Sequence, residues 1–153
     1  MRKQIDMDIY DNNTCLQIGR TCTCFNLRRA SRIVTQKFDE HLRKVGVKPN
    51  QFTILMIAHV NKDILLTRMA DFLGMERTTL TRNLSALERA ELLTVRVGED
   101  KRERLIRITS KGTALLEEAF PLWEKAQAEV VQTIGQEKFE KLFDILNDIR
   151  RKI

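Results

Sequence analysis

The sequence is poor in the residues that interrupt regular structure, since six glycines and two prolines are spread over 153 residues. Average usage would place Gly plus Pro at about 12% of a chain. This scarcity excludes a turn-rich β-sandwich or barrel, so helix is the expected default. The hydrophobic content of 42% is high enough to form a core and excludes wholesale disorder. At this length we expect a single domain over residues 1–153.

Long apolar runs are also absent, and the longest uninterrupted one extends only from Ile54 to Ala58. A membrane span needs about 20 apolar residues, so we expect no membrane partner. Residues 1–13 carry three aspartates and no apolar stretch, which is not the pattern of a signal peptide. Cys15, Cys22 and Cys24 are odd in number and close together, so they do not form the disulfide framework of a secreted domain. These features predict a cytoplasmic protein.

Motifs of enzymes and of metal sites are missing. The sequence has no Gly-rich phosphate loop, no His-Glu-x-x-His and no Ser/His/Asp signature, and its two histidines offer little for acid–base chemistry. The three cysteines have no histidine at ligand spacing nearby. We therefore expect neither an enzyme nor a cofactor nor a metal site.

The net charge of +6 is distributed unevenly along the chain. Residues 1–65 carry a net charge of +5, residues 66–112 carry +3 and residues 113–153 carry −2. A basic body with an acidic carboxyl end suggests a polyanionic partner for one part and a protein partner for the other.

A long first helix is predicted from Cys22 to Val45, because apolar residues recur there at steps of three and four. Phe25 and Ile33 lie on the other side of this helix. A helix that is apolar on two sides needs two packing partners, so its second partner is either the core of the same chain or a second subunit.

Shorter elements follow, separated by turn residues. Gly46 and Pro49 separate the first helix from the second, and Thr67 is the expected N-cap of a third helix that Gly74 ends. Thr109 or Ser110 is the expected cap of a long fifth helix. The expected elements are helices over 51–60, 67–73 and 77–90, strands over 92–97 and 105–109 around a turn at 98–101, and two carboxyl-terminal helices.

The helix over residues 77–90 has an unusual outer face. Its leucines fall on one arc, and the opposite arc carries hydroxyls and guanidiniums but no carboxylate. A surface that approaches phosphates cannot carry anions without repulsion, whereas Thr, Ser and Arg bind phosphates or base edges. The residues of this arc are Thr78, Thr81, Arg82, Ser85 and Arg89. A short helix, a glycine turn and such a helix predict a helix-turn-helix that enters the major groove of DNA.

A basic hairpin follows this helix and is expected to act as a wing. It holds five cations, Arg96, Lys101, Arg102, Arg104 and Arg107, against three acids. Such a hairpin reaches the adjacent minor groove, where narrow A·T-rich stretches attract arginine. We expect Asp100 to hold the guanidinium of Arg102 by a charge-assisted bond. The alternative is that the hairpin is charged only for solubility.

Three stretches of the sequence resemble the MarR family of bacterial transcription regulators. They are residues 66–73, residues 78–84 with 87–88, and the wing at residues 100–109 followed by Gly112. The resemblance implies a mainly α fold with a small β-hairpin wing, in which residues 46–112 form a winged helix-turn-helix lobe. It further implies that residues 1–45 and 113–153 form a helical dimerisation region, and that the homodimer binds a palindrome in double-stranded DNA.

The resemblance also assigns roles to residues. Thr78, Thr79, Thr81 and Arg82 would meet the major groove and Arg102 the minor groove. The full set expected to bind DNA is Thr67, Arg77, Thr78, Thr79, Thr81, Arg82, Ser85, Arg89, Lys101, Arg102 and Arg104. Glu91 departs from the pattern, because the family places glycine there. Since a left-handed Glu91 would be strained by about 1 kcal/mol, we expect the helix end to differ locally.

Three hypotheses about function follow. The first is a repressor that a small effector, such as an aromatic anion, releases from DNA. The second makes Cys24 a redox switch, because Cys24-Phe25 resembles the peroxide-sensing OhrR branch of the family and a helix amino terminus stabilises a thiolate. That branch uses tyrosines where this chain has Arg28 and Phe38. The third is a winged-helix module that binds protein and no DNA.

Overall fold

The computed structural model describes residues 12–152, so the prediction about residues 1–13 falls almost entirely outside the described residues. The chain divides into two compact units, residues 1–36 and 37–153. Among the described residues, no helix is long and apolar enough to cross a membrane.

The described part of the first unit is helical. It contains α1 (Asn12–Thr21), which was not predicted from the sequence, and most of α2 (Thr23–Leu42). The expected helix from Cys22 to Val45 thus ends at Leu42 and continues as the 3-10 helix η2 (Arg43–Val45). Gly46 closes η2 with a φ of 74°, a left-handed conformation that glycine adopts without strain.

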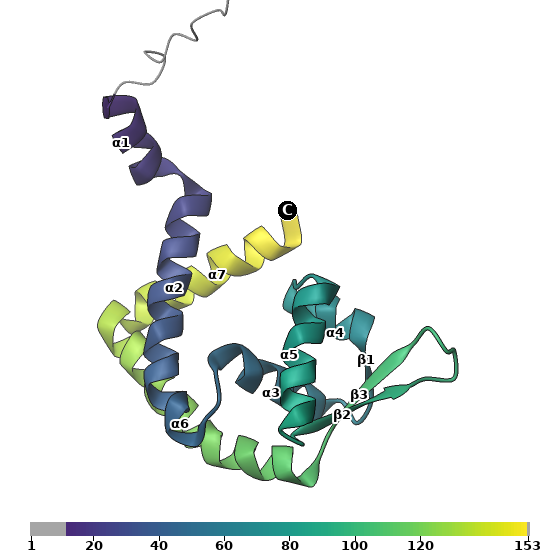
Figure 1. Cartoon of the computed structure of the whole chain (residues 1–153). Helices are drawn as coiled ribbons and strands as arrows, with labels where there is room; N and C mark the ends of the chain where they lie inside the picture. Colours follow the sequence, from purple (N-terminus) through teal and green to yellow (C-terminus); the bar gives the residue numbers. More distant parts are fainter. Residues whose placement is uncertain (1–11, 153) are drawn as a thin grey trace, which may run out of the picture. The chain divides into compact units, whose positions relative to one another are not determined.

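The second unit contains a winged helix-turn-helix (Figure 1). Pro49 is the first residue of α3 (Pro49–Val60), as its missing N–H favours. The next elements are β1 (Ile64–Leu65), α4 (Leu66–Leu73) and α5 (Arg77–Arg89), and then the strands β2 (Leu93–Val97) and β3 (Arg104–Ile108). Between α4 and α5, Gly74 is left-handed with a φ of 59°, and this fixes the turn of the motif.

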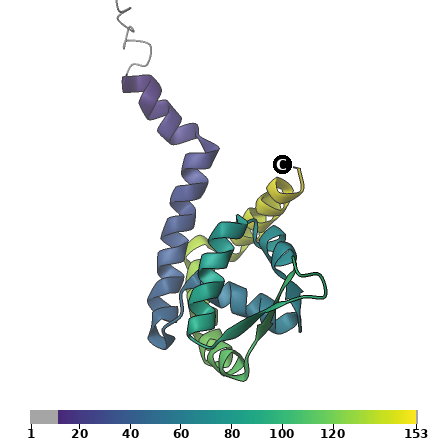
Figure 2. The same cartoon turned by 45° about the vertical axis from the view of Figure 1, so that its right-hand side comes forward.

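The sheet has three antiparallel strands in the order β1-β3-β2. Ile106 lies at its centre, opposite Ile64 of β1 and Val95 of β2. Strand β1 is only two residues long, and the sequence pattern gave no prediction for these two residues. Figure 2 shows the β2–β3 ribbon beside α5, with its hairpin extending beyond the helices.

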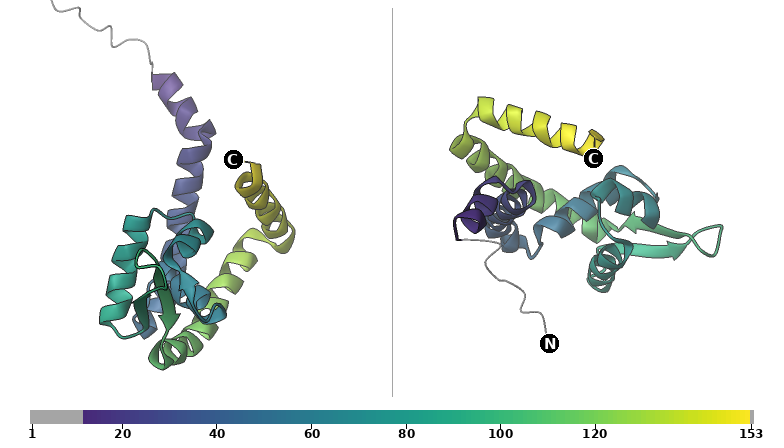
Figure 3. Two further views of the ribbon diagram at one scale, coloured as in Figure 1. Left: turned by 90° about the vertical axis from the view of Figure 1, so that its right-hand side faces the viewer. Right: turned by 90° about the horizontal axis from the view of Figure 1, so that it is seen from above.

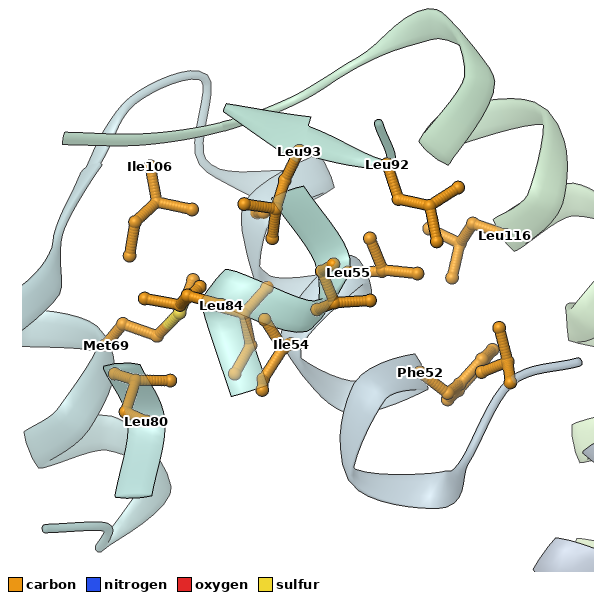
Figure 4. Packing of buried hydrophobic residues seen from close by; sticks show 14 of the residues in the cluster. Phe52, Ile54, Leu55, Met69, Leu80, Leu84, Leu92, Leu93, Ile106 and Leu116 are labelled. Atoms are coloured by element: carbon orange, nitrogen blue, oxygen red, sulfur yellow. The ribbon is translucent and has the colours of Figure 1, made fainter. Parts of the chain in front are cut away.

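The core of this unit lies between α3, α4, α5 and the sheet. Leu84 of α5 lies between Met69 of α4 and Ile54 of α3, and Leu93 and Ile106 close the cluster from the sheet (Figure 4). Each of these side chains is almost fully buried. Burial of an aliphatic side chain contributes about 1.5–3 kcal/mol, so this cluster sets the position of α5.

Two long helices complete the second unit, α6 (Ser110–Ile134) and α7 (Gln136–Lys152). The expected cap is confirmed, because the hydroxyl of Thr109 accepts a hydrogen bond from the N–H of Gly112 at 3.0 Å. Gly135 separates the two helices, and Figure 3 shows α7 turning back from the end of α6.

The expectation for Glu91 was wrong. Glu91 is left-handed, with a φ of 60°, and directly follows Ala90, the C-cap of α5. The conformation completes an ordinary helix end, because the N–H of Leu92 reaches the carbonyl of Leu87 at 2.9 Å. The helix therefore ends as a glycine-terminated helix would, although the residue has a Cβ.

Candidate nucleic-acid interface

The outer face of α5 is exposed because its leucine face is packed in the core. Leu80, Leu84 and Leu87 are buried in the core, so the opposite arc faces solvent. On that arc Ser85 is half-buried, and the other four residues are exposed, namely Thr78, Thr81, Arg82 and Arg89. Arg77 and Thr79, which are also expected to bind DNA, are exposed beside this arc. The acid-free arc read from the sequence is thus an exposed surface.

Two hydroxyls on this surface bond to their own helix. Thr81 Oγ1 donates to the carbonyl of Arg77 at 2.7 Å, and Ser85 Oγ donates to the carbonyl of Thr81 at 2.9 Å. Their protons are used, but their oxygens keep lone pairs that accept from a base amino group. These two residues are therefore suited to accept hydrogen bonds in this rotamer.

The amino ends of α4 and α5 have no side-chain cap. Leu65 and Glu76 occupy the N-cap positions, and neither caps its helix with a side-chain hydrogen bond. In α5 the N–H of Leu80 is the first to reach a helical carbonyl, that of Glu76, at 3.0 Å. First-turn N–H groups without a partner form a partial positive charge that attracts phosphate.

Thr67 was expected to cap the third helix, and this was wrong. The helix begins one residue earlier, at Leu66, because Ile64 and Leu65 pair with β3 and the chain turns directly from strand to helix. Thr67 therefore lies in the first turn of α4, where it is exposed.

Three cations are grouped at the tip of the wing, namely Lys101, Arg102 and Arg104, and all are exposed. The expected bond from the guanidinium of Arg102 to Asp100 is wrong. Asp100 Oδ1 instead accepts the backbone N–H of Arg102 at 2.8 Å, because an aspartate in a turn reaches the N–H two residues on more easily than a long side chain. Arg104 donates to the carbonyls of Lys101 and Glu103 at 2.8 and 2.9 Å.

The other two wing arginines lie at its base and contact Asp63. Arg96 donates to Asp63 Oδ1 at 2.8 Å, and Arg107 donates to both carboxylate oxygens, from Nε at 3.0 Å and from a terminal nitrogen. The hydrogen bonds from Arg107, and then those from Arg96, hold the pKa of Asp63 below its ordinary value. Nothing in the sequence signalled this contact, since Asp63 is more than 30 residues from either arginine.

Two further side chains fix α5 within the lobe. Asn83 Oδ1 accepts from Asn50 Nδ2 at the start of α3, at 2.8 Å. The carboxylate of Glu88, the one acid within α5, accepts the backbone N–H of Val95 in β2 at 3.0 Å. Glu88 is thus directed to the sheet, and it ties the helix to the wing.

A pocket of about 570 Å³ opens between α3, β1 and α4. Its walls are mainly apolar, and Val60 and Phe72 at its edge are 72% and 73% exposed. Arg68 and Asp71 are the charged residues in its lining. Its volume lies within the range of small-molecule sites.

The cysteines belong to the first unit. Cys24 is exposed and lies in the first turn of α2, whereas Cys22 directly precedes this helix. The Cys22 sulfur accepts the backbone N–H of Phe25 at 3.5 Å. Among the described residues, no three His, Cys, Asp or Glu side chains are grouped so as to hold a metal ion.

Comparison with known proteins places these features in context. The model of the MarR family matches residues 47–103, which span the helix-turn-helix and most of the wing. The transcriptional regulator MhqR of Bacillus subtilis is 27% identical over 124 residues, covering 80% of this chain and 86% of MhqR.

Solved structures of transcription regulators are similar to this chain over a longer part of it than the family model matches. The M. tuberculosis transcriptional regulator MosR in complex with DNA is 36% identical, with a TM-score of 0.70, over 84% of this chain and 98% of MosR. The transcriptional repressor CouR bound to p-coumaroyl-CoA is 26% identical, with a TM-score of 0.77, over 86% of this chain and 93% of CouR.

Proposed function

Because the chain belongs to the MarR family of DNA-binding transcription regulators, we propose that it is a homodimeric repressor which a small ligand releases from a palindromic operator. Its relatives are regulators and not enzymes, and the chain is a regulator as well. Its proposed place of action is the cytoplasm, where chromosomal DNA is accessible.

The exposed acid-free face of α5 is the observation that carries this proposal. Phosphates repel carboxylates at close range, so a helix face of hydroxyls and guanidiniums without carboxylates is typical of a surface that binds a duplex, and not of one that only faces solvent. Arg82 is exposed midway along α5 and is our candidate for a bidentate contact to guanine. Thr78 and Thr79, beside the uncapped end of the helix, are our candidates for phosphate contacts.

The wing tip would make the second set of contacts. Lys101 and Arg102 are exposed, and in the described part of the chain their side chains form no ion pair. We assign Arg102 to the minor groove next to the major-groove site of α5, and Lys101 to the phosphates. Arg104 lies near them, although its guanidinium also supports the turn.

The test uses Arg82→Ala and Arg102→Ala, with Arg150→Ala on α7 as the control that removes the same charge. The probe is a duplex selected in vitro from random DNA, and its binding is measured by fluorescence anisotropy at several salt concentrations. Arg82→Ala should lose about 1–3 kcal/mol of binding and relax specificity at one base pair. Arg102→Ala should weaken binding and reduce the salt slope by about one. Unchanged affinity in both variants would favour the protein-binding module instead.

Exposed apolar side chains on the terminal helices support the homodimer. In the first unit Phe25 and Ile33 of α2 are 46% and 58% exposed, and in the second unit Phe143 of α7 is 48% exposed. Apolar surface of this extent is typical of a protein interface. The carboxyl helices also carry the acidic excess, so they are poor candidates for contact with DNA.

Dimerisation is tested with Leu146→Glu on the apolar face of α7, against Lys138→Ala, which lowers the charge equally on the exposed face. Light scattering should show that only Leu146→Glu dissociates to monomers. The same variant should lose affinity for a palindrome whose half-sites are about 10 base pairs apart, because both recognition helices must lie on one face of the duplex. A Leu146→Glu dimer that binds normally contradicts the proposed interface.

A small effector is proposed because CouR, a related repressor, has been solved with p-coumaroyl-CoA. We test p-coumaroyl-CoA, free p-coumarate and free coenzyme A by thermal shift and by release of the DNA probe. A ligand that binds the folded state raises the melting temperature with concentration. If none of the three stabilises the protein or releases DNA, p-coumarate and its coenzyme A thioester are not the effector.

The alternative hypothesis makes Cys24 a redox switch, and it is favoured by the exposed position of Cys24 in the first turn of α2. In this version a hydroperoxide oxidises a cysteine thiolate to a sulfenic acid and is itself reduced to an alcohol. Cys24→Ser and Cys22→Ser are compared for release of the probe by cumene hydroperoxide. Release that persists in both variants removes the hypothesis.

A further inference from the structure

Asp63 joins three segments at the base of the wing. It lies between α3 and β1, Arg96 lies on β2, and Arg107 lies on β3. Its carboxylate accepts from both guanidiniums, and Arg107 Nε also donates to the carbonyl of Lys62 at 3.2 Å. The loop before β1 is thus bound to both strands of the hairpin.

The strand register explains why one carboxylate serves two arginines. Arg96 lies opposite Leu105, and Leu105 is two residues before Arg107 on the same strand. The two arginines are therefore diagonal neighbours on one face of the sheet, where two like charges repel. Asp63 offsets this repulsion and leaves both guanidiniums directed to the loop.

The contact also divides the cations of the wing into two groups. Arg96 and Arg107 are engaged at the base, with side chains about half exposed. Lys101 and Arg102 lie in the turn between β2 and β3, and Figure 3 shows this end of the hairpin extending beyond the helices. Beyond the end of β1 the wing is a two-stranded ribbon, which is weakly stable alone, so its angle to the helices depends on contacts at its base.

We propose that Asp63 is a positioning residue for DNA binding, which fixes the angle of the wing so that its tip and α5 reach the duplex together. This inference rests on the proposed contact of Arg102 with DNA. Asp63 itself does not bind DNA, because its carboxylate is occupied by the two arginines.

The direction of the change in Kd on replacing Asp63 distinguishes a positioning role from a purely electrostatic one. A carboxylate near a duplex repels phosphates, so its removal should tighten binding if charge alone acts. Loss of a fixed wing angle should weaken binding instead. Asp63→Asn keeps the size of the side chain and removes the charge, so the two explanations predict opposite changes in Kd.

The experiment uses the full chain and the selected duplex. Asp63→Asn should raise Kd at least about threefold, as expected for a residue within a coupled ion-pair network. Asp71→Asn on α4 is the control, since Asp71 is exposed and has no ion pair in the part of the chain that the structure describes. This control should leave Kd unchanged or lower it. Thermal unfolding of each variant confirms that it is folded at the assay temperature.

A double-mutant cycle with Arg102→Ala completes the test. If Asp63 acts through the tip of the wing, Asp63→Asn should have little further effect once Arg102 is alanine, whereas a general loss of stability would add to it. Tighter binding by Asp63→Asn, or additive losses, would overturn the proposal. If Arg102→Ala alone leaves Kd unchanged, the proposed contact of the wing with DNA is wrong. If Arg102→Ala raises Kd but Asp63→Asn does not, only the positioning role of Asp63 is wrong.

Discussion

Replacement of Glu91 by glycine should stabilise the protein. The φ of Glu91 is 60°, which is left-handed. An L-residue in this region is strained by about 1–2 kcal/mol because its Cβ approaches the following carbonyl oxygen. Glycine removes this strain but loses about 0.5–1 kcal/mol more backbone entropy on folding. The net gain in the free energy of unfolding should therefore be about 0.5–1 kcal/mol.

The other contacts of Glu91 change this value little. Its carbonyl accepts from the hydroxyl of Thr109 at 2.7 Å and its N–H donates to the carbonyl of Glu88 at 2.9 Å, and glycine retains both backbone groups. Its carboxylate pairs with Lys111 at 3.1 Å, but both side chains are more than half exposed. An exposed pair of this kind contributes little to stability.

Glu91→Ala is the matched control, because it removes the carboxylate and keeps the Cβ. Urea unfolding at one fixed protein concentration should rank Glu91→Gly above the parent and about 1 kcal/mol above Glu91→Ala. The melting temperature of Glu91→Gly should rise by about 2–4 °C for each kcal/mol gained. If alanine is as stable as glycine, backbone strain at this position is not the source of the effect.

Two further predictions concern the second unit. Gly112→Ala should lower the free energy of unfolding by about 1–3 kcal/mol in urea, because the new Cβ would overlap the backbone carbonyl of Leu92. Thr113→Ala serves as the neighbouring control. A loss of stability in Gly112→Ala no larger than that in the control contradicts this packing. The pKa of Glu129 is held below its ordinary value of 4.5 by hydrogen bonds from Lys37 and then from His41. The ionised carboxylate therefore stabilises the fold fully at pH values above 4.5, and this contribution is lost as the pH falls through the lowered pKa. Glu129→Gln should accordingly be less stable than the parent at pH 7, and the gap should narrow in strong acid; a gap independent of pH would show that charge is not involved.

Much of the lobe was predicted from local patterns. The expected helix over residues 77–90 is α5 to within one residue. Its leucines repeat with the helical period, and Gly74 ends the preceding helix and so separates the two. Thr109 or Ser110 was expected as a cap, because a hydroxyl before an apolar helix satisfies the free N–H groups of its first turn, and the structure shows that Thr109 is the cap. The acid-free arc followed from the same period, since the position of the leucines fixes the opposite side.

Two of the errors come from tertiary contacts that override a local preference, and one comes from a closer local contact. Thr67 is not a cap because pairing of β1 with β3 extends the chain to Leu65. Arg102 is not held by the Asp100 side chain because the carboxylate takes the nearer backbone N–H. Glu91 is left-handed because Thr109 and the strand that follows hold the chain in place.

Residue periodicity alone determined which faces are apolar and which carry cation and hydroxyl groups, because the spacing of side chains around a helix depends only on local geometry. Tertiary structure alone decided which cations are free. Arg96 and Arg107 look like Lys101 and Arg102 in the sequence, but a carboxylate more than 30 residues away occupies the first two. Ion pairing depends on distance in space, and only the folded chain brings Asp63 to the base of the wing.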